Sequence, residues 1–186
     1  YTPRELKHQL VDSGASVLLV VDNFGKTAQE ALAGTQVKQV ITTALGDLVG
    51  FPKGAIVNFV LKYVKKMVPD YDIPGAVRFK DTLTLGQLHA LPDVDIDSGD
   101  IAFLQYTGGT TGLSKGAVLT HHNVIAATLQ AEAWFTPALG KIGDVRKANH
   151  IMALPLYHIF ALTLSLLAMR QGGLMTLIPN PRDIPK

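Results

Sequence analysis

The sequence predicts an α/β fold in which layered, mostly parallel sheets are flanked by helices. Two observations support this fold class. Short apolar runs, several of them rich in β-branched residues, alternate with helical patterns, and the same alternation occurs in both halves of the chain. Apolar strands that alternate with helices are typical of parallel sheets covered on both faces. The 186 residues correspond to one domain, or to one domain with part of a neighbour.

Capping boxes predict where the first two helices begin, because a Ser or Thr side chain and a Glu three residues later satisfy free backbone amides. The two boxes are Thr2 with Glu5 and Thr27 with Glu30. The expected order is a helix from Thr2 to Gly14, a strand over residues 15–21, a helix from Thr27 to Gly34 and a strand over residues 37–43.

Residues 50–68 predict an amphipathic helix with a basic face. Ile56, Phe59, Val60, Tyr63, Val64 and Met67 share one face, and Lys62, Lys65 and Lys66 lie with Asn58 on the other, preceded by Lys53. Such a helix can lie on an anionic membrane through residues 53–67. The favoured interpretation is an ordinary helix that packs its apolar face on the sheet and leaves its lysines in water.

The second half repeats the alternation after an exposed connection at residues 92–100. Four aspartates in this connection have a spacing similar to that of a calcium loop, but the glycine and the distal Glu of an EF-hand are missing. We therefore expect a solvated turn. The following elements are strands over residues 101–106 and 116–119, a helix over 122–135 that His121 and His122 help to start, a strand over 151–154, a helix over 159–170 ended by Gly172 and Gly173, and a strand over 174–178.

The composition excludes several classes of protein. Hydrophobic residues make up 47% of the chain and charged residues 17%, which excludes general disorder. A formal net charge of +2 is too small to indicate a nucleic-acid-binding protein. The absence of cysteine excludes disulfides, cysteine-bound zinc and thiol catalysis within these residues.

Residues 105–116, Gln-Tyr-Thr-Gly-Gly-Thr-Thr-Gly-Leu-Ser-Lys-Gly, carry the strongest chemical signal. They contain four glycines, four Thr or Ser hydroxyls and one lysine. Glycines let backbone amides approach an anion closely, the hydroxyls donate hydrogen bonds, and Lys115 adds positive charge. The spacing fits neither a Walker A loop nor a dinucleotide fingerprint. The pattern predicts a polyphosphate-binding loop; a plain Gly/Thr turn would need neither the threonines nor the lysine.

This loop and the following Ala-Val-Leu-Thr-His-His-Asn resemble the signature of the adenylate-forming superfamily, which contains acyl-CoA synthetases, luciferases and peptide-synthetase adenylation domains. Residues 1–6 and the segment Leu-Pro-Leu-Tyr-His-Ile-Phe at 154–160 narrow the resemblance to the bacterial long-chain fatty-acid–CoA ligases. The resemblance covers essentially the whole chain. Ser114 departs from the broad family, which more often has Pro there.

The resemblance implies a two-step reaction. A fatty carboxylate attacks the α-phosphate of Mg-ATP to give acyl-adenylate and pyrophosphate, and the thiol of coenzyme A then displaces AMP. It implies that the loop holds the β- and γ-phosphates, with Lys115 acting in catalysis and Thr107 also contacting Mg²⁺. The implied nucleotide-binding residues are Thr107, Gly108, Gly109, Thr110, Thr111, Gly112, Ser114 and Lys115.

The resemblance also implies that residues 1–186 are part of a large N-terminal AMP-binding domain. The adenine-site region and the C-terminal domain lie beyond the match, so the full-length enzyme is expected to be active and this chain alone inactive. The resemblance further implies a cytoplasmic enzyme. Contact with the inner face of the cytoplasmic membrane and homodimerisation of the full-length protein are additional expectations. The alternatives are a fatty acyl-AMP ligase or another carboxylate–CoA ligase, and, in a different class, a non-catalytic anion-binding or membrane-associated module.

Residues 151–169 are nineteen residues with only four clearly polar side chains, which approaches the length of a membrane span. Pro155 and His158 lie inside this segment, so we favour a buried strand, loop and helix. His158 follows the predicted strand, where α/β sheets place ligand sites. The resemblance puts it beside the acyl pocket and the adenylate as a catalytic residue; the alternative is a core histidine bonded to the backbone.

Overall fold

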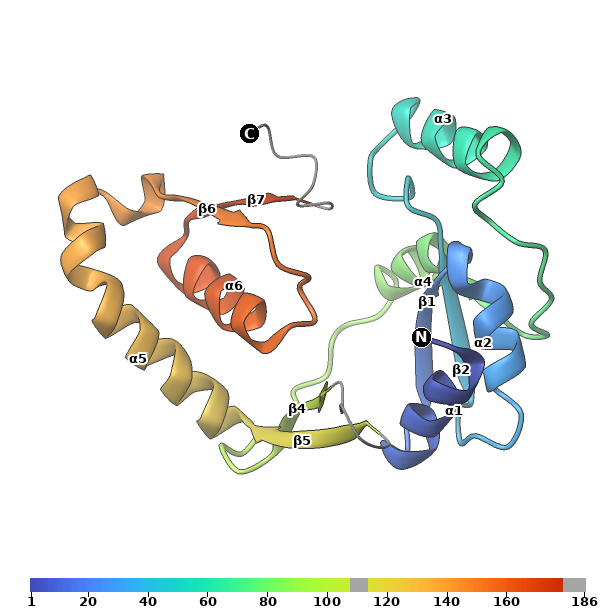
Figure 1. Cartoon of the computed structure of the whole chain (residues 1–186), viewed down its shortest axis with the longest axis horizontal. Helices are drawn as coiled ribbons and strands as arrows, with labels where there is room; N and C mark the ends of the chain where they lie inside the picture. Colours follow the sequence, from blue (N-terminus) through green and yellow to red (C-terminus); the bar gives the residue numbers. More distant parts are fainter. Residues whose placement is uncertain (108–113, 179–186) are drawn as a thin grey trace. The chain divides into compact units, whose positions relative to one another are not determined.

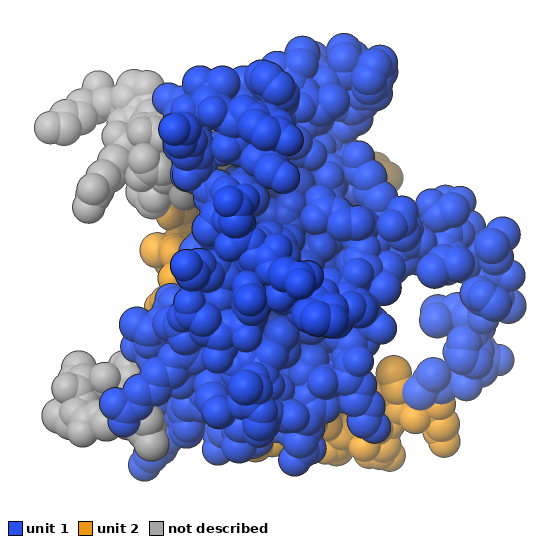
Figure 2. All heavy atoms as spheres, turned by 90° about the vertical axis from the view of Figure 1, so that its right-hand side faces the viewer, with its two compact units in different colours: residues 1–94, 108–116 blue, residues 95–107, 117–186 orange. Residues whose placement is uncertain are grey.

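The computed structural model describes residues 1–107 and 114–178 (Figure 1). The chain divides into two compact units, which Figure 2 colours separately. Unit 1 comprises Tyr1–Val94 with Gly108–Gly116, and unit 2 comprises Asp95–Thr107 with Ala117–Lys186. Each unit contains a parallel sheet with helices, which confirms the predicted α/β class.

Unit 1 is built on a three-stranded parallel sheet in the order β1-β2-β3, with Val17 opposite Gln39 and Ile41 opposite Val77. Helices α1 and α2 contact each other, and α4 contacts β2 and β3. Its elements are α1 (Pro3–Asp12), β1 (Val17–Val21), a 3₁₀ turn (Asp22–Phe24), α2 (Gly25–Ala31), β2 (Gln39–Thr43), α3 (Lys53–Phe59), a π-helical continuation (Val60–Val64), β3 (Val77–Arg78) and α4 (Phe79–Gly86).

Of the two expected capping boxes, the first is confirmed and the second is wrong. The Thr2 hydroxyl accepts the Glu5 amide at 3.3 Å, and the Glu5 carboxylate accepts the Thr2 amide at 2.6 Å. Helix α2 instead begins at Gly25, without a side-chain cap, so Thr27 lies inside its first turn. The reason is that the 3₁₀ turn after β1 runs directly into α2.

The sheet of unit 1 is not covered on both faces, contrary to the expectation from its apolar strands. Val40 and Thr42 on β2 are buried. On β1, however, Val17 and Leu19 are 52% and 55% exposed. Because side chains alternate along a strand, these two residues share one face. In the part of the chain that the structure describes, that face of β1 carries no covering layer.

The amphipathic segment also differs from its favoured interpretation. Its apolar face is exposed rather than packed, with Phe59 at 58% and Tyr63 at 61% exposure. The packed side is a different arc, which carries Gly54 and Asn58. Gly54 is buried in close backbone contact with Gly46, and a Cβ at either glycine would collide with the carbonyl oxygen of the other. The segment is thus held by contacts of Gly54 and of the Asn58 side chain, and its apolar face does not contribute.

Unit 2 contains two small sheets and a pair of helices. β4 pairs with β5, while β6 and β7 are parallel, with Asn149 opposite Leu174. The long helices α5 and α6 contact each other, and Arg170 donates to Glu132 at 2.7 Å between them. Its elements are β4 (Ile101–Thr107), β5 (Lys115–Thr120, whose first two residues belong to unit 1), α5 (His121–Leu139), 3₁₀ turns (Gly140–Ile142 and Val145–Lys147), β6 (Asn149–Met152), α6 (Ile159–Gln171) and β7 (Leu174–Leu177).

Helix α5 begins where the histidine pair predicts. Thr120 and Asn123 form a capping box, and His121 and His122 are the first two helical residues. Their amides donate to the carbonyls of Asp100 and Ser98 at 3.0 and 2.8 Å. The start of α5 is therefore bonded to the turn that closes the preceding connection.

The connection before β4 is exposed over residues 91–100 and has no regular structure over residues 91–97. The Asp97 carboxylate accepts the Gly99 amide at 2.8 Å, and the Asp100 carboxylate accepts the Asp97 amide at 2.9 Å. These carboxylates close a turn. Among the described residues, no cluster of three or more His, Asp or Glu side chains could hold a metal ion.

The apolar segment at residues 151–169 forms the expected strand, loop and helix, although β6 ends at Met152, earlier than predicted. It is only partly buried. Met152 and Leu167 lie in the core, whereas Ile151 and Phe160 are 66% and 53% exposed. Of the helices that the structure describes, none has the length and apolar character needed to cross a bilayer.

Candidate functional site

The predicted phosphate loop connects β4 to β5. Thr107 is the last residue of β4 and Lys115 the first of β5, and both side chains are exposed. Five of the residues predicted to bind nucleotide lie outside the described residues, namely Gly108, Gly109, Thr110, Thr111 and Gly112. Of the residues predicted to bind nucleotide, the described ones are thus Thr107, Ser114 and Lys115, which lie at the ends of two paired strands or next to them.

The C-terminal end of the loop is bonded to helix α1. The His8 ring Nε2 lies 2.9 Å from the carbonyl oxygen of Ser114, the residue before Lys115. A carbonyl can only accept, so Nε2 carries the proton and donates. Nothing in the sequence pattern indicated His8, because the two partners are 106 residues apart.

The strand that leads into the loop is bonded to the turn before α6. Gln105 Nε2 donates to the Tyr157 carbonyl at 2.8 Å. Gln105 lies two residues before Thr107, and Tyr157 is adjacent to His158. This bond brings the end of β4 close to the segment that carries the second predicted catalytic residue.

His158 is the N-cap of α6. Its ring Nδ1 accepts the Phe160 amide at 3.3 Å, and the side chain is exposed. The alternative of a core histidine is wrong about burial, whereas the bond to the backbone that it assumed is present. Because Nδ1 accepts, the neutral ring carries its proton on Nε2, which leaves Nε2–H as a hydrogen-bond donor. His158 has a structural role at the helix start and a ring edge that a ligand can reach.

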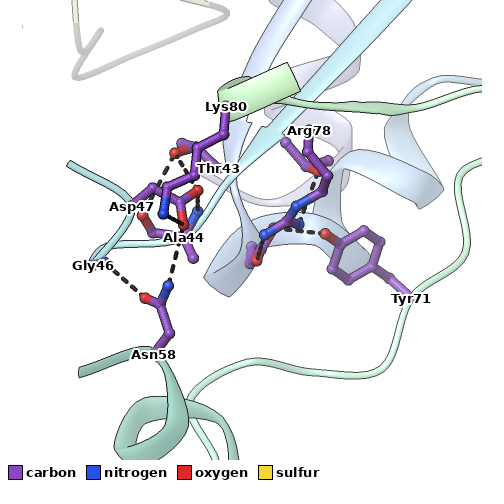
Figure 3. Close-up of polar contacts among 10 residues, drawn as sticks. Thr43, Ala44, Gly46, Asp47, Asn58, Tyr71, Arg78 and Lys80 are labelled. Carbon is purple, nitrogen blue, oxygen red and sulfur yellow. Dashed lines mark hydrogen bonds and ion pairs between the residues drawn. The ribbon is translucent and has the colours of Figure 1, made fainter. Parts of the chain in front are cut away.

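A second group of polar side chains lies at the carboxyl edge of the β1–β2–β3 sheet. Arg78 donates to both carboxylate oxygens of Asp22, at 2.9 and 3.0 Å, and to the Thr42 hydroxyl at 3.1 Å. The Tyr71 hydroxyl donates to Asp22 at 2.7 Å (Figure 3). These bonds join residues at the ends of all three strands. Sequence reasoning missed them, since Asp22 and Arg78 are 56 residues apart.

These contacts shift the ionisation of the groups involved. The hydrogen bonds to Asp22 raise the pKa of the Arg78 guanidinium, against the opposing effect of burial. Burial raises the pKa of Tyr71, and its hydrogen bond to Asp22 raises it further. Both shifts favour the protonated forms, in which these side chains donate their hydrogen bonds. A cavity of about 470 Å³ adjoins the group, with Lys62 and Asn58 also in its lining.

Asp47 is the centre of a neighbouring cluster, shown in Figure 3. It accepts the Ala44 amide at 2.8 Å and the Thr43 hydroxyl and Asn58 amide at 3.1 Å each. Burial alone would raise the pKa of Asp47, but these hydrogen bonds outweigh it and hold the pKa below its ordinary value. Lys80 approaches Asp47 only to 3.9 Å. The cluster attaches the amphipathic segment to the end of β2.

Comparison with known proteins agrees with the loop pattern. The family model for AMP-binding enzymes matches residues 1–186. The chain is 50% identical over 185 residues to a long-chain-fatty-acid–CoA ligase of Haemophilus influenzae, covering 99% of this chain and 33% of the relative. It is 49% identical to the corresponding ligase of Yersinia pestis, covering 100% of this chain and 32% of the relative. The chain thus spans about a third of the length of the curated relatives it matches.

Solved structures share the fold at lower identity. ATP-bound MatB from Rhodopseudomonas palustris superposes with a TM-score of 0.63 at 21% identity, covering 97% of this chain and 29% of that protein. A long-chain-fatty-acid–CoA ligase from Archaeoglobus fulgidus gives 0.57 at 23% identity, covering 95% and 28%. Together with the match over the full chain, the loop and the parallel sheets show that this chain belongs to the AMP-binding enzyme family.

Proposed function

We propose that the full-length protein activates long-chain fatty acids with ATP and transfers the acyl group to coenzyme A. The observation that carries this proposal is the loop at residues 105–116, whose pattern suits a polyphosphate, in a chain about half identical to long-chain-fatty-acid–CoA ligases. Fatty carboxylate, ATP and coenzyme A are the substrates of the proposed reaction.

The residues beside the loop have the chemistry that the first step requires. When a carboxylate oxygen attacks the α-phosphate, the bond to the β-phosphate breaks and negative charge gathers on pyrophosphate. The exposed ammonium of Lys115 can stabilise that charge as it develops. The Nε2–H group of the exposed His158 side chain is a second donor, which could bond to the adenylate or to the fatty carboxylate.

The described residues also fit the proposed Mg²⁺ requirement. Mg²⁺ in such sites keeps several waters and is bound by substrate phosphates together with one or two protein oxygens, which can include a Ser or Thr hydroxyl. The Thr107 hydroxyl at the end of β4 would be that oxygen. The ion would neutralise phosphate charge, and the ammonium group of Lys115 would add a further positive charge.

The test is fatty-acid-dependent exchange of labelled pyrophosphate into ATP by the full-length protein. We expect exchange with long-chain acids, and acyl-CoA once coenzyme A is added. Exchange without any thioester would instead identify an acyl-AMP ligase. A well-folded protein that exchanges with no fatty acid would contradict the proposal.

We propose further that residues 53–67 contact an anionic membrane surface, which accords with a cytoplasmic enzyme at the inner face of the cytoplasmic membrane. The segment exposes Lys53, Lys62, Lys65 and Lys66 together with apolar side chains such as Phe59 and Tyr63. Both kinds of side chain are therefore available to headgroups and acyl chains.

Homodimerisation stays a prediction for the full-length protein, and sedimentation analysis would test it.

Replacing Lys62, Lys65 and Lys66 by Gln should weaken binding to anionic vesicles at low salt. Each lysine near such a surface contributes about 1 kcal/mol, less for side chains that stay hydrated. The matched control replaces Lys7, Lys26 and Lys38, three exposed lysines of the same unit. Equal vesicle binding by the two triple variants would contradict the membrane proposal.

A further inference from the structure

We propose that His8 is a positioning residue for Lys115, acting through the carbonyl of Ser114, the residue before it. The inference rests on the proposed function, because it assigns His8 a part in acyl-adenylate formation. The basis is the hydrogen bond from His8 Nε2 to Ser114 O, at 2.9 Å. The bond fixes the backbone one residue before the only lysine of the loop.

The donor is carried by a well-anchored helix. The capping box of Thr2 and Glu5 fixes the start of α1, Leu10 is 5% exposed, and α1 contacts α2. His8 is itself partly buried, so water competes less for its hydrogen bond than at an exposed site. A rigid donor that reaches a residue 106 positions away holds the start of β5 in a defined place.

The position of Lys115 matters because its charge must meet the departing pyrophosphate. A displacement of about 1 Å in a catalytic group can cost about 100-fold in rate. Loss of the His8 donor leaves β5 paired with β4, so we expect a smaller effect. His8→Phe should lower the single-turnover rate of acyl-AMP formation about tenfold at saturating ATP, on the same partial-displacement argument.

The experiment compares His8→Phe with His8→Gln in the full-length protein. Phe keeps a planar ring and removes the donor, whereas the Gln amide can place an N–H near the position of Nε2. We expect Gln to recover the rate to within about threefold of the original. His89→Phe is the matched control, since His89 is an exposed histidine of the same unit, and it should leave the rate unchanged.

A double-mutant cycle separates positioning from general destabilisation. If His8 acts through Lys115, His8→Phe should cost little further in a Lys115→Ala background. The thermal unfolding midpoints of all variants should agree closely. A full tenfold loss in that background, or Gln behaving like Phe, would overturn the proposal.

Hydrogen–deuterium exchange gives a readout that does not depend on activity. Peptides covering residues 114–120 should exchange faster in His8→Phe than in His8→Gln or the unaltered protein, because the anchor of that segment is lost. Unchanged exchange there would overturn the inference even if the proposed ligase activity is observed. If His8→Phe speeds amide exchange but the unaltered protein does not exchange pyrophosphate into ATP, the role of His8 in fixing this segment stands. The proposed function is then refuted.

Discussion

Two regions of this molecule use polar side chains at strand ends in opposite ways. At the carboxyl edge of β1–β2–β3, Asp22, Arg78 and Asp47 bond to side chains around them, so their hydrogen-bonding capacity is largely used within the protein. Around β4 and β5, Gln105 and His8 bond instead to backbone carbonyls. Those bonds fix the chain while the side chains of Thr107 and Lys115 stay exposed.

The difference shows why the most connected polar cluster is not the best candidate for chemistry. A carboxylate held by a bidentate guanidinium has little left to offer a ligand, and its contribution is to join strands. A lysine at a strand start, with its backbone anchored and its ammonium in solvent, can still bind a phosphate. Predictions can therefore separate effects on stability from effects on rate.

Lys115→Ala should give the largest effect on rate. We expect adenylation at saturating ATP to fall about 10- to 100-fold, less than at a fully buried oxyanion site, because backbone amides and hydroxyls of the loop remain. The ATP dissociation constant should change by a smaller factor. Single-turnover acyl-AMP formation measures the first quantity and equilibrium binding the second, with Lys26→Ala as the control.

Normal adenylation at saturation with greatly weakened ATP binding would mean that Lys115 holds only the ground state. A normal adenylation rate together with normal ATP binding would show that Lys115 has no part in the mechanism. The contrast between a structural cluster at β1–β3 and a catalytic group at β4–β5 would then no longer hold.

Arg78→Met should give the largest effect on stability. It leaves the Asp22 carboxylate buried without its cation, a change that costs about 3–5 kcal/mol for a fully buried pair. The Arg78 side chain is 47% exposed, so we expect about 2 kcal/mol, or roughly 30-fold faster exchange of β1–β3 amides. Adenylation at saturating ATP should stay within about twofold.

Lys80→Met is the control for Arg78, because its 3.9 Å approach to Asp47 and its exposure give a weak ion pair. Equal exchange rates in the two variants would contradict a stabilising role for the Asp22–Arg78 pair.

The Asp47 cluster should make unit 1 sensitive to acid. The pKa of Asp47 is lower in the folded protein than in the unfolded chain, where it is about 3.9. The stabilisation from its charge is therefore present above that unfolded pKa and is lost as the pH falls through the lower folded pKa. At pH 6, Asp47→Asn should speed exchange at the end of β2 about fivefold, as expected for a weakened charged acceptor. The difference between variant and original should shrink at pH 3.

A difference that is constant between these two pH values would show that the lost interactions do not depend on the charge of Asp47. Thr43→Val, which removes one donor to the same carboxylate, gives a second measure of the cluster.

Gln105→Leu should have the smallest effect. It removes an exposed hydrogen bond to Tyr157, so we expect adenylation to fall about two- to fivefold, in line with a single neutral bond. Gln87→Leu, an exposed glutamine at the end of α4, is the control. A larger loss for Gln87 than for Gln105 would show that the β4–turn bond does not position the site.

The sequence predicted elements with strong local signals. Helix α1 begins at its capping box, α5 at the histidine pair, and α6 at Ile159 with a left-handed Gly172 at its end. It did not predict β3, because two residues give no periodicity, nor α4, which starts without a side-chain cap. Local patterns also failed for the packing of the amphipathic segment, where Gly54 and Asn58 override the apolar stripe.

The candidate site was predictable in the same uneven way. The composition of residues 105–116 indicates phosphate chemistry without any knowledge of the fold. Two contacts join segments that are distant in sequence, that of His8 with Ser114 and that of Gln105 with Tyr157. No local sequence pattern predicts such contacts. These residues come together only in the folded chain, as does the capping contact of His158 with α6.

The connection before β4 has a practical consequence for handling the protein. Residues 91–97 combine exposed backbone without regular structure and exposed apolar side chains, among them Leu91 at 93%, Val94 at 67% and Ile96 at 58%. Proteases cut extended, accessible chain in preference to helices and strands. An endopeptidase that prefers large apolar residues should therefore cut within residues 91–97, and that cut falls in the chain between α4 and β4.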